Sequence, residues 1–216
     1  MRSPLEARGA SPRETRQRGE RNILPQDLLD HYAFARKDTY ASQPSSDALP
    51  DLSIPGTKGF VYPPEVIESG HSLPYRYRDE WVSGKEKGAF SGREINFSRY
   101  DESDLITWYS YMGGLTEEGM RLGEDFVYEI LLRAFLRRYS NRVRLGGYFQ
   151  FEHQTEQGNI VYKGEGIRTG RSWHDTETIE LNGARLYLGK GDGGYDPAAR
   201  RRALDAQIAE LRREEF

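Results

Sequence analysis

The sequence predicts an α+β fold in which two antiparallel β-meander repeats form a curved sheet, packed by a central helix and by short N- and C-terminal helices. Three observations predict this fold. Strand-like stretches with Gly-rich turns occupy residues 75–114 and again 148–194. A helical pattern of apolar residues lies between them, over 123–139. Phe-Ser-Gly at 90–92 is matched by Tyr-Lys-Gly at 162–164, which indicates that one supersecondary unit occurs twice.

The composition of this 216-residue chain is that of an ordinary soluble protein, with 30% charged residues, 36% hydrophobic residues and a net charge of −3. We divide the chain into a disordered tail (1–24), a single α+β domain (25–195) and a C-terminal amphipathic helix (196–216), a division that suits its length. A weakly acidic chain offers phosphates no bulk attraction, so the composition does not favour a nucleic-acid partner.

The chain has no cysteine, which excludes disulfides, thiolate metal sites and cysteine nucleophiles. Its apolar runs are shorter than the ~18 residues that a membrane helix needs, and it lacks the pattern of a signal peptide. We therefore expect a cytoplasmic protein that does not associate with membranes.

The N-terminal part contains one helix between irregular segments. Residues 1–24 include few apolar side chains, which predicts disorder. Pro25 is favoured in a first helical turn, and Arg36 and Lys37 suit a helix C-terminus, so a short helix is expected between them. Prolines scattered over 43–74 predict a long loop.

The first repeat is a hairpin with its turn at 84–88, followed by a third strand that ends at the Gly-Gly pair 113–114. Folding the two arms symmetrically places Glu80 opposite Arg93, a favourable cross-strand pair. The same register predicts three pairs on the aromatic face: Tyr77 with Asn96, Asp79 with Glu94, and Trp81 with Gly92.

The pairing of Asp79 with Glu94 puts two carboxylates side by side on an aromatic face. Like charges directly opposite each other destabilise a sheet, and an apolar setting raises the pKa of one of them. A basic side chain, a shared proton, a metal or a ligand has to compensate. The structural alternatives are a partly solvated face, or an arginine from elsewhere that pairs with both acids.

The second half repeats the pattern after the core helix at 123–139. Its hairpin covers 148–167, its third strand 185–188, and a Gly-rich turn 189–194 follows. His174 and Asp175 are expected in a solvated loop. The predicted hairpin pairs are Phe149 with Gly166, Phe151 with Gly164, and His153 with Tyr162.

The C-terminal helix has a thin apolar stripe of Leu204, Ile208 and Leu211. Such a stripe favours a helix docked on the domain surface, and the alternative is an oligomer contact through this helix.

Two patterns resemble cofactor or metal sites without meeting their requirements. Residues 189–194 match Gly-x-Gly-x-x-Gly, but the strand and acid that a dinucleotide site needs do not follow, and Asp192 would repel a phosphate. The histidines lack the spacing of a zinc site; they are His31, His71, His153 and His174. We therefore expect neither a cofactor nor a metal.

Five short segments follow one another in a recognisable order: Ala-Arg-Lys-Asp-Thr-Tyr-Ala at 35–41, Pro-Gly-Thr-Lys at 55–58, Tyr-Arg-Asp at 77–79, Phe-x-Gly-x-Glu at 90–94, and Trp108 with Tyr111 before Gly113. Together they resemble DUF5680, a prokaryotic family of domains of unknown function that also occurs fused to helix-turn-helix regulators. The similarity covers residues 28–194. The spacing after Trp108 departs from the family pattern by one residue, and the second repeat reads Gly-Glu-Gly-Ile at 164–167. The resemblance implies the fold boundaries and a single domain, but no chemistry.

The leading functional hypothesis is a domain that binds a small ligand or a protein partner on its aromatic sheet face. The alternatives are a hydrolase-type enzyme that uses Asp79 and Glu94 as a carboxylate pair, since cross-strand neighbours lie as close as the carboxyl groups of retaining glycosidases, and a purely structural interaction module. The sequence leaves catalysis open and favours binding. The candidate ligand-binding residues are Tyr77, Asp79, Trp81, Phe90, Glu94, Trp108 and Tyr111.

Overall fold

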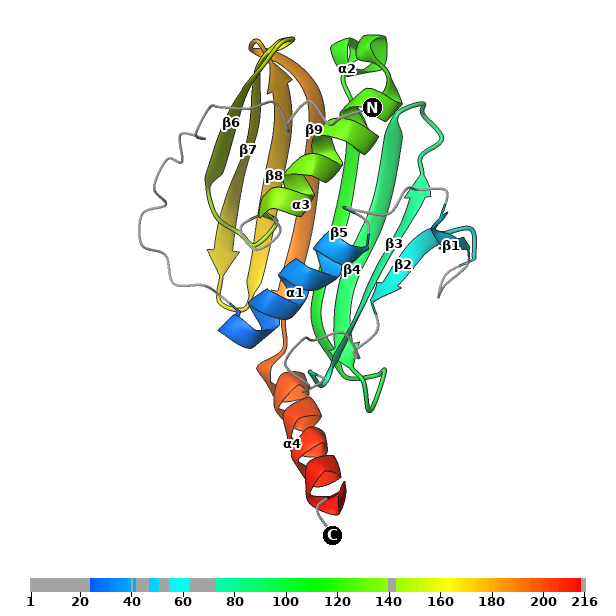
Figure 1. The fold of residues 1–216 in the computed structure, drawn as a ribbon, viewed down its shortest axis with the longest axis vertical. Helices are drawn as coiled ribbons and strands as arrows, with labels where there is room; N and C mark the ends of the chain where they lie inside the picture. Colours follow the sequence, from blue (N-terminus) through cyan, green and yellow to red (C-terminus); the bar gives the residue numbers. More distant parts are fainter. Residues whose placement is uncertain are drawn as a thin grey trace.

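The computed structural model describes residues 24–39, 41, 47–50, 55–62, 73–139 and 143–214. Within these residues the chain forms an α+β fold around an open, nine-stranded antiparallel sheet (Figure 1). The strand order is β1-β2-β3-β4-β5-β9-β8-β7-β6, so the two halves of the sequence meet where β5 pairs with β9. The predicted α+β class with antiparallel strands is therefore confirmed.

The elements follow the chain in this order. The first half contains α1 (Gln26–Asp38), β1 (Leu49–Pro50), β2 (Lys58–Tyr62), β3 (Tyr75–Ser83), β4 (Ala89–Ser98), β5 (Leu105–Leu115) and α2 (Glu117–Leu122). The second half contains the π-helical segment η3 (Asp125–Leu132), α3 (Arg133–Tyr139), β6 (Phe149–Thr155), β7 (Gly158–Thr169), β8 (Ser172–Leu181), β9 (Ala184–Tyr195) and α4 (Pro197–Glu214).

Helices α1 and α3 cross the same face of the sheet (Figure 1). The continuous helix formed by η3 and α3 occupies the stretch predicted as the core helix. It buries Val127, Leu131 and Phe135 completely, in one cluster with Tyr162 and Ile179 of the sheet. Apolar residues at helical spacing thus form one side of the core, as periodicity leads one to expect.

Helix α1 covers the first half of the same face. Its apolar residues Leu28, Leu29 and Tyr32 are buried, and the Tyr32 ring makes an edge contact with Tyr77 of β3. Leu24, which was predicted to belong to the disordered tail, is also buried in the core. The remainder of that tail, residues 1–23, lies outside the described residues.

The predicted register of the first hairpin is confirmed at every pair. Tyr77 is the partner of Asn96, Asp79 of Glu94, and Trp81 of Gly92. On the opposite face of the sheet, Arg93 donates to Glu80 over 3.0 Å, as the same register requires.

The predicted register of the second hairpin is wrong by two residues. Phe149 pairs with Gly164 instead of Gly166, and His153 pairs with Ile160 instead of Tyr162. The turn closes one residue earlier than predicted, at Glu156–Gln157, where Gly158 takes a φ of +128° that favours glycine. A slip of two residues keeps each side chain on its predicted face, because side chains alternate along a strand.

The sequence does not predict strand β8, and it indicates a solvated loop for His174 and Asp175. His174 is exposed on the strand, but Asp175 is only 2% exposed. The inward positions of β8 include both Asp175 and Glu177, so the strand lacks the apolar alternation that would identify it from sequence.

The Gly-rich segment 189–194 lies within β9 and is not a turn. Aromatic rings lie across the strand at this point. A side chain at Gly191 would collide with the ring of Tyr109, and one at Gly193 with the ring of Trp173. These glycines therefore make room for rings on the inward face.

Helix α4 extends beyond the end of the sheet (Figure 1). It buries Ala199 and Ala203, whereas Ile208 and Leu211 of the predicted stripe are exposed. Ion pairs from Arg202 to Asp104 and from Arg200 to Asp27 attach it to the domain.

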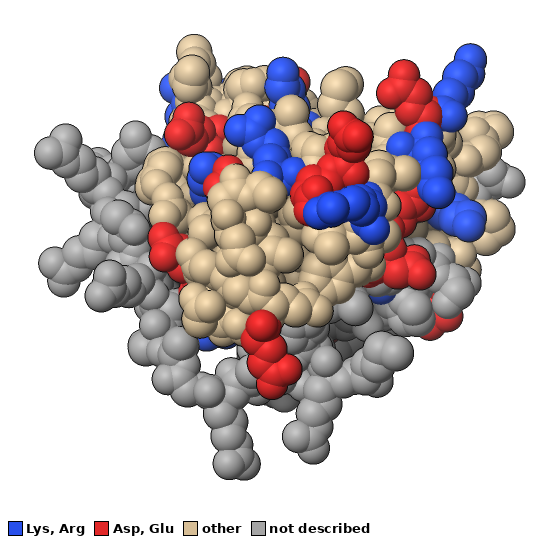
Figure 2. Space-filling view, turned by 90° about the horizontal axis from the view of Figure 1, so that it is seen from above, with Lys and Arg blue, Asp and Glu red and all other residues tan. Residues whose placement is uncertain are grey.

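Among the described residues, no helix combines the length and the apolar character needed to span a membrane. Figure 2 shows acidic and basic side chains of the described residues interspersed on the end of the molecule seen from above.

Candidate functional site

The predicted site residues fall on both faces of the sheet. Tyr77, Asp79, Glu94 and Tyr111 are buried on the face covered by the helices, and Trp81 and Phe90 continue that face toward the turn between β3 and β4. Trp108 is 36% exposed on the opposite face. Trp108 and Tyr111 are three residues apart on one strand. Because side chains alternate between the two faces of a strand, they point to opposite faces, which could have been predicted from their spacing in the sequence.

The two acids predicted to lie side by side have different partners. Glu94 accepts hydrogen bonds at one oxygen from Arg36 Nε, over 2.7 Å, and at the other from Arg144 Nη1, over 3.0 Å. The three side chains are each 3% exposed. Glu94 is thus fully engaged by two arginines, one from α1 and one from the segment before β6.

Arg144 extends this network into the second half of the sheet. Its Nη2 donates to Glu177 of β8 over 2.8 Å, and Glu177 also accepts from the hydroxyls of Tyr162 and Tyr187 over 2.5 and 2.8 Å. Burial alone would raise the pKa of Glu177, but the charge of Arg144 and these hydrogen bonds hold the pKa below its ordinary value. Two buried cations and two buried carboxylates therefore satisfy one another.

The backbone at Arg144 is unusual, because its φ of +58° lies in the left-handed region. Such a conformation costs on the order of 1–3 kcal/mol for a residue other than glycine and persists only where the surroundings impose it. Here Trp173 Nε1 donates to the Arg144 carbonyl, Arg36 donates to the Val143 carbonyl, and the Gly146 N–H donates to Asp175. No sequence pattern singles out this arginine, which lies in a stretch without periodicity.

Asp79 lies next to Glu94 but forms no ion pair among the described residues. The hydroxyl of Tyr111 donates to its Oδ1 over 2.7 Å. Burial, and then the negative charge of Glu94, raise the pKa of Asp79 to about 7, against the opposing charges of Arg144 and Arg36. Asp79 therefore changes protonation near neutral pH.

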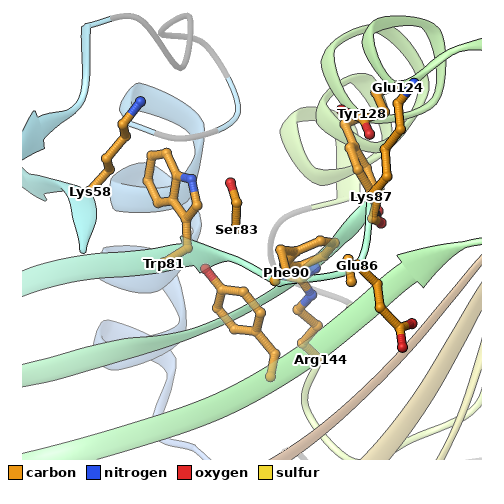
Figure 3. A pocket seen from close by; sticks show the side chains of 13 residues that line it. Lys58, Trp81, Ser83, Glu86, Lys87, Phe90, Glu124, Tyr128 and Arg144 are labelled. Carbon is orange, nitrogen blue, oxygen red and sulfur yellow. Dashed lines mark hydrogen bonds between the residues drawn. The ribbon is translucent and has the colours of Figure 1, made fainter. Parts of the chain in front are cut away.

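A pocket of about 310 Å³ opens beside these residues, at the turn between β3 and β4. Figure 3 shows Lys58 and Trp81 on one side, Glu124 and Tyr128 on the other, and Phe90 with Arg144 below. Its lining comprises Lys58, Trp81, Ser83, Gly84, Glu86, Lys87, Gly88, Ala89, Phe90, Tyr111, Glu124, Tyr128 and Arg144.

The aromatic walls of the pocket are packed against one another. The ring centroid of Phe90 lies 5.9 Å from that of Tyr111 and 5.2 Å from that of Tyr128. The ring centroid of Trp81 lies 5.5 Å from that of Phe60, which is outside the lining. These contacts fix the orientation of the rings. The prediction included Trp81, Phe90 and Tyr111 but missed Lys58, Tyr128 and Arg144, which lie outside the hairpin, and Lys87 of its turn.

The described residues offer no group of three or more side chains able to hold a metal ion. The Nε2 atom of His153 is 3.0 Å from the Tyr139 hydroxyl, and Nδ1 of His174 is 2.8 Å from Asp192.

Comparison of the chain with known protein families, with curated proteins and with solved structures found no match.

The raised pKa of Asp79 predicts a stability effect. Folding raises this pKa from 3.8 to about 7, so in this window the folded protein holds a proton that the unfolded chain releases, and the free energy of unfolding falls as the pH rises. Asp79→Asn mimics the protonated acid. We expect the difference in the free energy of unfolding, variant minus wild type, to increase by roughly 1 kcal/mol or more from pH 5 to pH 8.

Denaturant unfolding at both pH values measures this gain, with exposed Asp30→Asn as the control. The difference between variant and wild type is the informative quantity, because burial lowers the pKa of His31 to about 4 and so makes an opposite contribution to the wild-type profile. An Asp79→Asn advantage that does not change with pH would contradict the assignment.

Proposed function

We propose that the pocket between β2, β3, β4 and the start of η3 binds a small ligand. The observation that carries the proposal is an aromatic pocket of about 310 Å³ directly above a buried, fully paired ionic network. A volume of ~300 Å³ lies at the lower end of the range for small-molecule sites. The lining combines aromatic rings with charged and polar side chains.

The floor of the pocket supports this proposal because several contacts hold its arginine in place. Arg144 reaches it from a left-handed backbone held by Trp173 and Arg36. Backbone strain of this kind is concentrated at functional sites, where the surrounding structure maintains it.

The segments that resemble DUF5680 also converge here, and we propose that this resemblance reflects a shared site. Arg36 pairs with Glu94, Tyr111 donates to Asp79, and Lys58 and Phe90 line the pocket.

The alternative functions have less support. In the hydrolase reading, both oxygens of Glu94 already accept hydrogen bonds from arginines, so Asp79 is left as the acid able to exchange a proton through Tyr111. A protein partner on the aromatic face would meet α1 and α3, which cross that face (Figure 1). A cytoplasmic location, suggested by the absence of cysteine, belongs to the proposal as well.

A thermal-shift screen of metabolites and sugars tests the proposal, followed by titration of each hit against Trp81→Ala and Trp108→Ala. Trp81 lines the pocket, whereas Trp108 lies on the opposite face. We expect Trp81→Ala to weaken binding at least about tenfold, which corresponds to ~1.4 kcal/mol, and Trp108→Ala to leave it unchanged. Hits that bind both variants equally well would contradict a site in this pocket.

A further inference from the structure

The charges around the pocket are unevenly distributed. Lys58 is the direct partner of Trp81 in the pairing of β2 with β3, so the two side chains project from the same face within reach of each other. Lys58 is exposed and forms no ion pair within the described part of the chain. As far as the described residues go, a cation without a counter-ion therefore lies beside Trp81.

The acidic residues of the lining do not neutralise this cation. In Figure 3, Glu124 lies on the side of Lys87, across the pocket from Lys58, and the carboxylate of Glu86 extends away from the rings of Trp81 and Phe90. The side of the pocket formed by Lys58 and Trp81 is consequently positive.

The floor does not present a carboxylate to a cationic ligand. Glu94 is bound by Arg36 and Arg144, and Asp79 accepts the hydroxyl of Tyr111, which itself lines the pocket. These acids lie behind the side chains that contact the pocket, so a bound cation would meet the arginine and the lysine first.

We propose that the ligand of this pocket is a flat aromatic ring bearing one anionic group, with the ring against Trp81 and Phe90 and the anionic group at Lys58. This inference rests on the proposed function and specifies the ligand class for the same pocket. Aromatic rings prefer offset or edge contacts with such walls, and an ammonium group forms charge-assisted hydrogen bonds with carboxylate, sulfonate or phosphate oxygens.

Three naphthalene derivatives that differ mainly in charge test the inference: 2-naphthoate, 2-naphthamide and 2-naphthylmethylammonium. Their dissociation constants are measured by calorimetry with the full-length protein. We expect naphthoate to bind at least about tenfold more tightly than the amide, and the ammonium derivative to bind most weakly. High salt should weaken naphthoate binding alone, because salt screens charge pairs near the surface.

Lysine variants locate the anionic group. Lys58→Met keeps most of the side-chain volume and should weaken naphthoate binding about five- to tenfold, in line with the loss of roughly 1–1.4 kcal/mol, without changing the affinity for the amide. Lys85→Met, at an exposed position of the turn between β3 and β4 but outside the lining, is the control and should change neither affinity.

Two kinds of result would overturn the inference. One is an amide or ammonium derivative that binds as tightly as naphthoate, or equal effects of Lys58→Met and Lys85→Met. The other is failure of all three probes to bind while screening hits still depend on Trp81, which would retain the pocket but reject the aromatic acid. Loss of the Trp81 dependence itself would instead reject the proposed function.

Discussion

Glu94→Gln should lower the free energy of unfolding by about 3–5 kcal/mol, the usual cost of removing one partner from a buried ion pair. The change keeps the shape of the side chain but removes the charge that Arg36 and Arg144 share at distances of 2.6 and 3.0 Å. Both guanidiniums are 3% exposed, so water cannot replace the lost partner. Chemical denaturation at pH 7 measures the effect.

Glu180→Gln is the matched control, because Glu180 pairs with Lys163 at a partly exposed position. Pairs of that kind contribute about 0–1 kcal/mol. A Glu94→Gln protein that is more stable than wild type would show that Glu94 is strained in the empty protein. It would then be a carboxylate held in readiness for a ligand, contrary to the structural role that its two arginines indicate.

Leu131→Ala should cost about 2–5 kcal/mol, because deleting a fully buried leucine leaves a cavity that its neighbours fill only in part. Leu131 is 0% exposed in the cluster that joins η3 and α3 to the sheet. Leu122→Ala is the control, since Leu122 is 38% exposed. A Leu131→Ala loss below about 0.5 kcal/mol, the size usual for surface substitutions, would contradict the packing of this helix on the sheet.

Local patterns predicted the parts of the fold in which the type of each side chain matches its inward or outward position. The register of the first hairpin followed from symmetry about its turn and from the pair Glu80–Arg93. Strand β8 and the β9 glycines could not be predicted, because their inward positions carry acids or no side chain at all. The tertiary structure explains both: Arg144 pairs with an acid of β8, and the rings of Tyr109 and Trp173 lie against the β9 glycines.

Only the part of the candidate site that lies within the first hairpin was predictable from the sequence. Strand alternation indicated that Asp79 and Glu94 share a face with Trp81, and the pairing of the strands is as expected. The partners that decide what these acids do are Arg36 and Arg144, which lie 58 and 50 residues from Glu94 in the chain. No periodicity connects segments at that separation, so the sequence showed the need for a compensating cation without showing which one.

The buried network also bears on how the domain loses its structure. It joins α1, β4, the segment before β6, and β8, so the opening of either half of the sheet would expose arginines or glutamates whose partners remain in the other half. Opening either half of the sheet therefore carries the electrostatic cost of separating the charges of this network. Strands β4 and β8 are accordingly tied into one cooperative unit, although each belongs to a different half of the chain.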